Sequence, residues 1–466
     1  MTFTKRKATM AVSAAAIAGI FVMTMLFIPT HATASIQSTT QIKNVDQIIP
    51  AKPVSSAILS SEDLQLSMPA AFVPVTPQQA YADEDSDHVH GVVHNITLVA
   101  VEKTIQLPLV VGPSGNLPMG PATQVIAYTF NGTIPGPTIR VNQGDYINVT
   151  VIDPVTNTDN HGVDNHAAII SAVPNFLPTA PGTTKHYLFQ ATEPGLFLYH
   201  CEGNVDDLAE HVFRGMQGGV IVDPRDGYKT GPAKDIFLDF SEYYLANTGD
   251  FDWTAMFNNQ PTYTWMNGIP FGYQVLGPTT YPSGSGAPLP PFSTVGLPSV
   301  VGAVPLHFNV GDHIRFFLLN AGDTLINYHL VGQQLQRVDQ GGAIQENVQT
   351  FNLGGSNSAI ADVTFNQPGA YVIVDHNYAQ LFKGRVAVIL VDNSSPNNSN
   401  PSNAVPPMGR DSLPQGPPLQ YAFGTPLPAS CLIDNSGTWT ISSASSCNDQ
   451  KPQSNGGTVD TNSNNQ

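Results

Sequence analysis

A strand-and-turn pattern that occurs twice in the chain is the feature that most constrains its fold. The segment FQATEPGLFLYH (189–200) is matched by FNQPGAYVIVDH (365–376), each with Pro-Gly before an apolar run that ends in histidine. A Gly-Asp turn between two alternating strands also recurs, in TIRVNQGDYINVTVID (138–153) and in LHFNVGDHIRFFLLNAG (306–322). Alternation of apolar and polar residues indicates half-buried strands. The sequence therefore predicts a duplicated all-β architecture.

The composition supports the same fold class. The chain of 466 residues has 39 Pro and 40 Gly, and only 11% of its residues are charged. Abundant turn-forming residues and scarce helical periodicity favour an all-β protein, and the length allows two or three domains. From the shifts in composition we expect five segments: residues 1–34 for export, a linker or arm over 35–91, a first domain over 92–224, a second over 225–392, and an Asn/Ser/Pro-rich, disordered-looking tail over 393–466.

The N-terminal segment has the features of an export signal. Basic residues occupy positions 5–7, an apolar run follows over 8–28, and small residues at 32–34 resemble a cleavage site. The run is long for a signal peptide, so an uncleaved membrane anchor is the alternative. We therefore expect an exported protein that is periplasmic, pseudoperiplasmic or extracellular, with a membrane anchor if the segment is retained.

The net charge of the chain and its cysteines indicate which partners and which kind of site to expect. The formal net charge of −17 argues against nucleic acid as a partner, because an acidic protein repels a polyanion. Of the three cysteines, Cys431 and Cys447 lie close together in the tail, where an oxidising compartment permits a disulfide. Cys201 is then left unpaired, and metal binding is the leading reason for an odd thiol in an exported protein.

Cys201 stands in a pattern of metal ligands. His211 and Met216 follow it in the spacing Cys-x9-His-x4-Met, and His161 precedes it by forty residues. Two imidazoles, a thiolate and a soft thioether suit a blue, type 1 copper centre that transfers electrons. The alternative is a buried thiol with scattered histidines, and the ordered set of four ligands argues against it.

A second set of histidines points away from the first. His200 precedes Cys201, so on an extended strand the two side chains lie on opposite faces. His161 and His166 are five positions apart, an odd number, which has the same consequence. His166 and His200 could therefore bind a second copper, for which a third imidazole is needed. His376 ends the equivalent strand of the second repeat, and we expect it to supply that ligand.

These motifs resemble those of a known family, the two-domain, NO-forming copper-containing nitrite reductases of the multicopper oxidase and cupredoxin superfamily. The shared motifs are His-x-x-Asp-x-His (161–166), His-Cys followed by His-x4-Met (200–216), His-Leu-Val-Gly (329–332) and a late His-Asn (376–377). The resemblance covers about residues 92–392. It implies two tandem cupredoxin domains, each a Greek-key β-barrel or sandwich.

The resemblance also implies a role for each candidate residue, with one type 1 and one type 2 copper per subunit. The expected ligands are His161, Cys201, His211 and Met216 for type 1 copper, and His166, His200 and His376 for type 2 copper. Asp164 and His329 match the catalytic residues, and Val331 matches a substrate gate. Gln349 and Thr350 stand where the family orients its catalytic histidine.

The implied activity is the reduction of nitrite to nitric oxide, as in denitrification. An electron from a small redox protein would enter at type 1 copper and pass through the bonded pair Cys201–His200 to type 2 copper. Two protons are also needed, and a carboxylate (Asp164) with an imidazole (His329) suits their delivery. In the family, type 2 copper lies between the first domain of one subunit and the second domain of the next. A homotrimer is therefore implied.

Three other functions remain open. A two-domain multicopper oxidase could act on oxygen, but its trinuclear cluster needs His-x-His pairs, and the chain has one such pair, His88 and His90, in the expected arm. A related enzyme could keep both coppers and act on another small nitrogen compound, such as hydroxylamine. An electron carrier would need the type 1 site alone, which leaves His166, His200 and His376 without a purpose.

The loop between Cys201 and His211 departs most from the family. It is longer than in many members and carries four acidic residues, Glu202, Asp206, Asp207 and Glu210. We expect the loop beside an exposed edge of His211, where the electron donor docks. Either it forms a docking surface for a basic donor, or it is an ordinary solvated loop.

Overall fold

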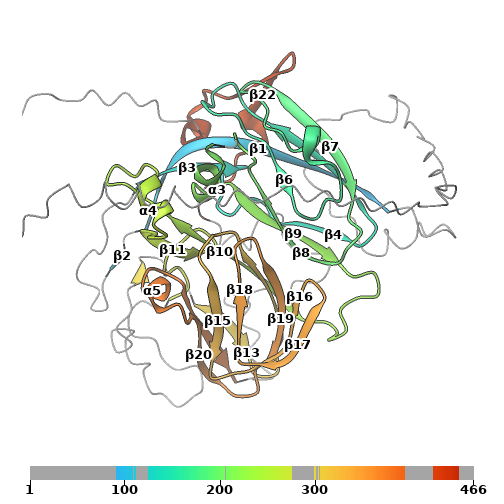
Figure 1. Ribbon diagram of the computed structural model, residues 1–466, viewed down its shortest axis with the longest axis vertical. Helices are drawn as coiled ribbons and strands as arrows, with labels where there is room; N and C mark the ends of the chain where they lie inside the picture. Colours follow the sequence, from blue (N-terminus) through green and yellow to red (C-terminus); the bar gives the residue numbers. More distant parts are fainter. Residues whose placement is uncertain are drawn as a thin grey trace, which may run out of the picture. The chain divides into compact units, whose positions relative to one another are not determined.

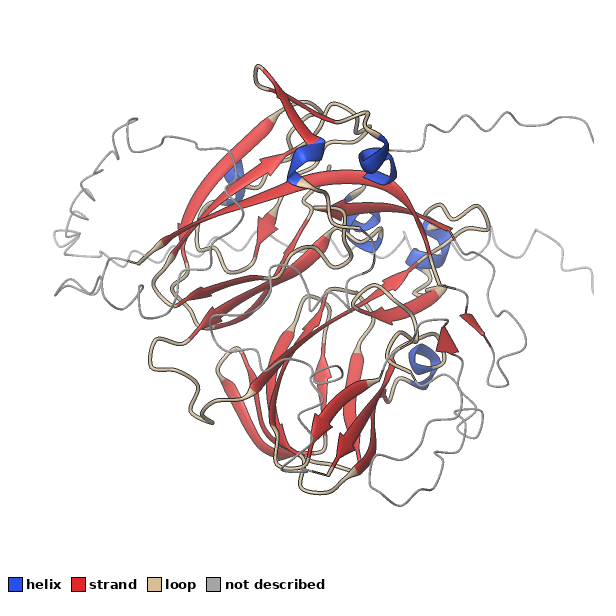
Figure 2. Ribbon diagram, turned by 180° about the vertical axis from the view of Figure 1, so that it is seen from behind, coloured by secondary structure: helices blue, strands red, loops and turns tan. Residues whose placement is uncertain are grey.

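The computed structural model describes residues 91–108, 110–111, 124–204, 206–274, 299–300, 303, 305–393, 423 and 425–450. These residues form two β-sandwiches in chain order, followed by a small C-terminal hairpin (Figure 1, Figure 2). The expected export segment and, apart from Gly91, the expected arm lie outside the described residues. Within the described part, no helix has the length and apolar composition needed to cross a membrane.

The first sandwich has two four-stranded sheets. In sheet order, the strands are β3 (Gln124–Phe130), β1 (Val93–Gln106), β5 (Tyr146–Ile152) and β7 (Thr184–Gln190), then β4 (Ile139–Asn142), β9 (Gln217–Asp223), β8 (Gly195–His200) and β6 (Asp164–Asn165). Alternating side chains set the inner faces, as in β5, where Ile147, Val149 and Val151 are buried. These residues belong to an apolar core shared with Val220 and Val222 of β9 on the other sheet.

The second sandwich repeats this plan with larger sheets. The six-stranded sheet is β11 (Tyr263–Met266), β10 (Lys234–Tyr243), β14 (His313–Asn320), β19 (Ser358–Thr364), β16 (Leu335–Gln340) and β17 (Ala343–Val348), and the five-stranded sheet is β13 (Leu306–Asn309), β21 (Val386–Asp392), β20 (Gly369–Asp375), β15 (Ile326–Val331) and β18 (Thr350–Leu353). Phe316 of β14 packs in one core cluster with Tyr328 of β15 and Ile373 of β20. A further pair, β2 (Val110–Val111) and β12 (Ser299–Val300), is antiparallel.

The two predicted repeats occupy equivalent strands. The segment 195–200 is β8, the segment 369–375 is β20, and each pairs with the next long strand, β9 or β21. A short helix follows each of them, α3 (Leu208–Phe213) after β8 and α5 (Tyr378–Leu381) after β20. Two other short helices, α2 (Ala172–Asn175) and α4 (Trp253–Phe257), follow β6 and β10. The predicted all-β, duplicated architecture is confirmed. The expected division at residues 224 and 225 lies between β9 and β10 and stays a prediction.

Part of the C-terminal tail is ordered, contrary to expectation. A hairpin of β22 (Leu432–Asn435) and β23 (Thr438–Ile441) lies between two 3-10 helices, η2 (Ala429–Cys431) and η3 (Ser445–Gln450), and a disulfide joins Cys431 to Cys447. Both cysteines and Ile441 are buried with Val99 and Val101 of β1. The polar composition of the tail concealed this small apolar set, whose burial against β1 is the physical reason for its order.

Candidate metal centres

Four of the predicted ligands meet in the first sandwich. His161 lies just before β6, Cys201 follows β8 directly, His211 is on α3 and Met216 precedes β9. The Nδ1 atoms of His161 and His211 lie 3.5 and 3.3 Å from the Cys201 Sγ. All four residues are at most 1% exposed. The backbone N–H of Cys201 donates to the carbonyl of Met216 at 2.9 Å, which joins the two ends of the ligand-bearing loop.

The surroundings of Cys201 favour its thiolate, the form that binds metals. Burial raises the pKa of the thiol, but hydrogen bonds and charge from His161 and His211 outweigh burial and lower the pKa to about 6. Tyr128 packs edge-on against both imidazoles, with ring centroids 5.4 and 5.0 Å apart. The three donor atoms thus lie within 4.8 Å of one another and are shielded from water, as a site for a metal cation requires.

A buried glutamate outside the ligand motifs holds His161. The Nε2 of His161 donates to Glu102 Oε1 at 3.1 Å, and the backbone N–H groups of Thr158 and Asp159 donate to the same oxygen at 2.9 Å. Metal-bound histidines commonly donate their second N–H to a carboxylate, which fixes the tautomer and the ring orientation. The available sequence signal was one acidic residue inside an apolar strand, ITLVAVEKTIQ (96–106).

Asp164, His166 and His200 form a second cluster of possible metal ligands. The Nε2 atoms of His166 and His200 are 3.3 Å apart, and Asp164 Oδ2 lies 3.9 and 3.8 Å from them. His200 Nδ1–H donates to the carbonyl of Cys201 at 2.9 Å, so its Nε2 faces the cluster. Burial, together with the charge of His200, lowers the pKa of His166 and favours the neutral, metal-binding imidazole. The adjacent residues His200 and Cys201 thus belong to different clusters.

His329 and His376 lie together in the second sandwich. His329 is on β15, His376 follows β20, and their ring centroids are 5.0 Å apart. His329 Nδ1–H donates to the carbonyl of Gln349 at 2.6 Å, and Thr350 Oγ1 lies 3.5 Å from the same nitrogen. Both residues therefore contact His329, where the resemblance places them. Val331, two residues further along β15, is 42% exposed.

One chain does not bring all the expected ligands of the second copper together. Among the residues that the structure describes, two groups of His, Cys, Asp and Glu have three or more ligand atoms within 4.8 Å of one another. These are the Cys201 cluster and the Asp164 cluster, and neither contains His329 or His376. The fold of a single chain therefore leaves His376 outside both clusters.

The expected exposed edge of His211 is absent. The residue is 1% exposed, because its own loop covers the ring. Asp207 Oδ1 lies 3.5 Å from His211 Nε2. A Cβ placed on Gly203, whose φ of +51° falls in the left-handed region, would lie 3.2 Å from His211 Nδ1. The loop is thus folded onto the imidazole.

The acidic residues of this loop have different surroundings. Glu210 pairs with Arg214 at 2.5 Å, so its charge is matched locally. Burial and the charge of Asp164 raise the pKa of Glu202, which indicates that Glu202 is near the second cluster. Asp206 is exposed. The loop thus combines a charge matched by Arg214, a charge near the second cluster and an exposed charge, and its role in docking a donor stays a prediction.

The two clusters have the donor chemistry of two kinds of copper. His161, Cys201 and His211, with Met216 at the end of their loop, combine imidazole with soft sulfur in a buried site, which suits an electron-transfer copper. The second cluster combines imidazoles with a carboxylate and is partly exposed, which suits a metal that binds a small molecule. A β-sandwich with such a Cys-His-Met loop defines a copper protein of the cupredoxin class.

Comparisons with known proteins agree with this class. The multicopper oxidase family profile matches residues 115–227. The copper-containing nitrite reductase of Cereibacter sphaeroides is 30% identical over 330 residues, which cover 68% of this chain and 81% of that protein. The copper-containing nitrite reductase of Neisseria gonorrhoeae is 30% identical over 278 residues, 57% of this chain and 63% of that protein. The chain thus spans slightly less than two thirds of the Neisseria relative.

A solved structure agrees as well. The copper nitrite reductase of Nitrosomonas europaea superposes with a TM-score of 0.55 and 29% identity, over 68% of this chain and 98% of that one. The chain belongs to the family of copper-containing nitrite reductases, which are oxidoreductases. The resemblance inferred from the motifs and the two-domain cupredoxin fold are confirmed.

Proposed function

We propose that this protein reduces nitrite to nitric oxide with one type 1 and one type 2 copper per subunit. The observation that carries the proposal is the junction at the end of β8, where His200 and Cys201 enter different clusters of ligands. An electron carrier needs one cluster, whereas an enzyme that accepts single electrons and acts on a small molecule needs two. Family membership supports nitrite as that molecule.

The candidate ligands belong to two proposed copper sites. His161, Cys201, His211 and Met216 would hold type 1 copper, and His166 and His200 would hold type 2 copper together with His376. Bound copper would carry one electron at the first site, and at the second it would bind nitrite and polarise it. The backbone and side chains of Cys201 and His200 provide a covalent connection between the two sites. This connection is short, because Cys201 and His200 are adjacent in the chain.

Nitrite, one electron and two protons give nitric oxide and water, so the site must deliver protons. Asp164 Oδ2 lies within 4 Å of both imidazole nitrogens of its cluster, where it can hydrogen-bond a nitrite oxygen. His329 donates Nδ1–H to Gln349, which leaves its Nε2 to accept and release a proton. We therefore assign Asp164 and His329 as the proton-delivering residues, with Val331 as the gate for nitrite.

A neighbouring subunit would supply the missing imidazole. Each half of the site is bordered by apolar side chains that a single chain leaves exposed: Ile169 (72%) near His166, and Tyr378 (60%) and Phe382 (59%) near His376. The two surfaces differ, so their contact is of the head-to-tail kind that closes into a ring. This arrangement supports a homotrimer in which His376 of one copy completes the site on the next.

The electron donor and the compartment follow from the same features. We propose a small redox protein with a basic docking face as donor, because the chain has a net charge of −17. We propose an exported location, because the disulfide between Cys431 and Cys447 is typical of an oxidising compartment.

The test combines copper EPR with detection of nitric oxide. The wild-type protein should contain two coppers per subunit, one blue and one with an ordinary EPR signal, and should release nitric oxide from nitrite under a reductant. His376→Ala should empty the type 2 site and abolish nitric oxide release, while the blue absorbance persists. His186→Ala, at an exposed histidine on β7, is the control and should leave both signals unchanged.

Three results would contradict the proposal. A wild-type protein with one blue copper alone would be an electron carrier. Turnover of oxygen or hydroxylamine without turnover of nitrite would support one of the other enzymes. Loss of the blue absorbance in His376→Ala would show that the ligands are assigned to the wrong sites.

A further inference from the structure

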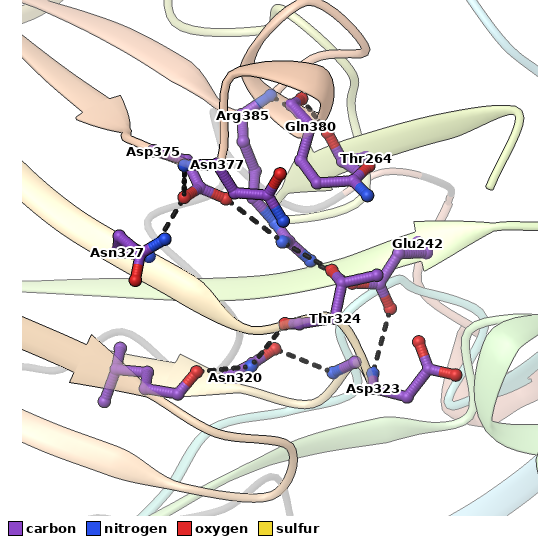
Figure 3. Close-up of polar contacts among 12 residues, drawn as sticks. Glu242, Thr264, Asn320, Asp323, Thr324, Asn327, Asp375, Asn377, Gln380 and Arg385 are labelled. Atoms are coloured by element: carbon purple, nitrogen blue, oxygen red, sulfur yellow. Dashed lines mark hydrogen bonds and ion pairs between the residues drawn. The ribbon is translucent and has the colours of Figure 1, made fainter. Parts of the chain in front are cut away.

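A buried group of charges lies in the second sandwich (Figure 3). Arg385, immediately before β21, is completely buried between Glu242 of β10 and Asp375 of β20. Its Nη1 lies 3.4 Å from Asp375 Oδ2 and donates to Thr324 Oγ1 at 2.7 Å, and its Nη2 donates to Glu242 Oε1. One guanidinium therefore connects three segments that are far apart in the sequence.

Asp375 links Arg385 to the backbone around His376. Its Oδ1 accepts the backbone N–H of Asn377 at 2.8 Å and that of Asn327 at 2.9 Å. The N–H of His376 donates to the carbonyl of Asn327 at 2.9 Å. Because neighbouring side chains on an extended strand alternate, Asp375 points into the core while His376 points outward. The inner carboxylate thus fixes the backbone on both sides of the outward imidazole.

Glu242 likewise fixes the backbone of the segment that precedes His329 in the chain. Its carboxylate accepts the backbone N–H of Asp323 at 3.1 Å and the hydroxyl of Thr324. These residues immediately precede β15, on which His329 lies. Arg385 consequently fixes the approach to β15 through Glu242 and the end of β20 through Asp375.

We propose that Arg385 is a positioning residue that sets the relative placement of His329 and His376. This inference rests on the proposed function, in which the two imidazoles deliver a proton and complete the copper site. Buried ion pairs are often no more stabilising than apolar residues of the same volume, so stability alone gives little reason for this group. Its geometry gives one, because each carboxylate that pairs with Arg385 also accepts a backbone N–H from the segment before His329 or around His376.

The test compares Arg385→Lys with Arg315→Lys. Arg315 is a matched control, since it is also buried in the second sandwich and pairs with two aspartates, Asp235 and Asp362, but contacts neither histidine segment. Lysine keeps the charge but loses the planar fork that reaches several acceptors at once. Arg385→Lys should weaken type 2 copper about 10–100-fold and change its EPR hyperfine splitting, as expected when an outer contact of a ligand is lost. Arg315→Lys should change neither property.

Asp375→Asn and Asp375→Ala provide a second pair if Arg385→Lys does not fold. The amide of asparagine keeps one oxygen for the N–H groups of Asn327 and Asn377, and alanine removes it. The asparagine variant loses the charge that pairs with Arg385 but keeps an acceptor for the backbone, so it should weaken type 2 copper about as much as Arg385→Lys. The alanine variant also loses the backbone acceptor and should lose type 2 copper. In both, the blue absorbance from the first sandwich should persist and reports that the protein is folded.

The outcomes separate this inference from the proposed function. A wild-type protein without type 2 copper or nitrite reduction would overturn the proposed function itself. A functional wild type whose folded Arg385→Lys and Asp375→Ala variants keep normal type 2 affinity and EPR spectra would overturn the role of Arg385. Crystal structures of the variants should show displaced His329 and His376 rings with an unmoved Cys201 cluster.

Discussion

At the scale of single residues, the sequence predicted which candidate ligands lie together in two clusters, but it did not predict the residues that hold them. His200 and Cys201 are neighbours, so the alternation of a strand was enough to separate their clusters. Glu102 touches His161 across 59 positions and Arg385 touches Glu242 across 143. Such contacts follow from strand order and register, which local patterns do not specify.

Replacement of Glu102 tests how far His161 depends on its carboxylate. Glu102→Gln should weaken copper at the Cys201 cluster about 10–100-fold, because an amide replaces an acceptor oxygen with an N–H donor that faces other donors. The measurement is competition with a chelator, followed by the blue absorbance. Glu346→Gln, at an exposed position on β17, is the control and should leave copper affinity unchanged. Equal affinities in the two variants would remove Glu102 from the support of the site.

At the scale of elements, repetition was the informative signal. The match between 195–200 and 369–375 predicted equivalent strands, and β8 and β20 have this relation. The same match selected His376, which stands at the position equivalent to His200. Composition was less informative for the C-terminal tail. Cys431 and Cys447 suggested a disulfide, but the few apolar residues that dock the hairpin on β1 were hidden among polar ones.

Removal of this disulfide should lower stability without affecting copper. The bridge spans 16 residues, and the double variant Cys431→Ala/Cys447→Ala should lose about 2–4 kcal/mol of stability through greater freedom of the unfolded chain. The measurement is urea unfolding of the metal-free protein. A thiol reductant should lower the urea concentration at the unfolding midpoint of the wild type toward that of the variant. It should leave the midpoint of the variant unchanged. Coincident transitions of the untreated proteins would contradict the prediction.

At the scale of the whole molecule, the fold places the residues of the proposed type 2 site in two different sandwiches. The described chain has Asp164, His166 and His200 in one sandwich and His329 with His376 in the other, and it contains no group that joins them. Sequence reasoning reached the same division by counting imidazoles per repeat. It could not give the apolar residues around each half, because exposure depends on the folded surface.

Mixed oligomers test whether two chains share one site. His166→Ala and His376→Ala homotrimers should both be inactive, because each lacks a type 2 ligand. Subunits mixed at equal amounts after dissociation should recover about one quarter of the wild-type activity, since that share of random interfaces pairs an intact first half with an intact second half. The measurement is nitric oxide release after remixing. The control mixes each variant with itself, and absence of recovery in trimers shown to be mixed would place all ligands within one chain.

The Cys201 cluster is buried within one chain, whereas the proposed type 2 site needs two chains, so protein concentration would control the activity. A dissociated copy would keep all four type 1 ligands and could take up an electron, but it would have only half of the place where nitrite reacts. Dilution would therefore turn a reductase into an electron store. Nitric oxide, a reactive product, would form only where enough copies have met, and turnover per chain should fall steeply below the concentration at which the trimer assembles.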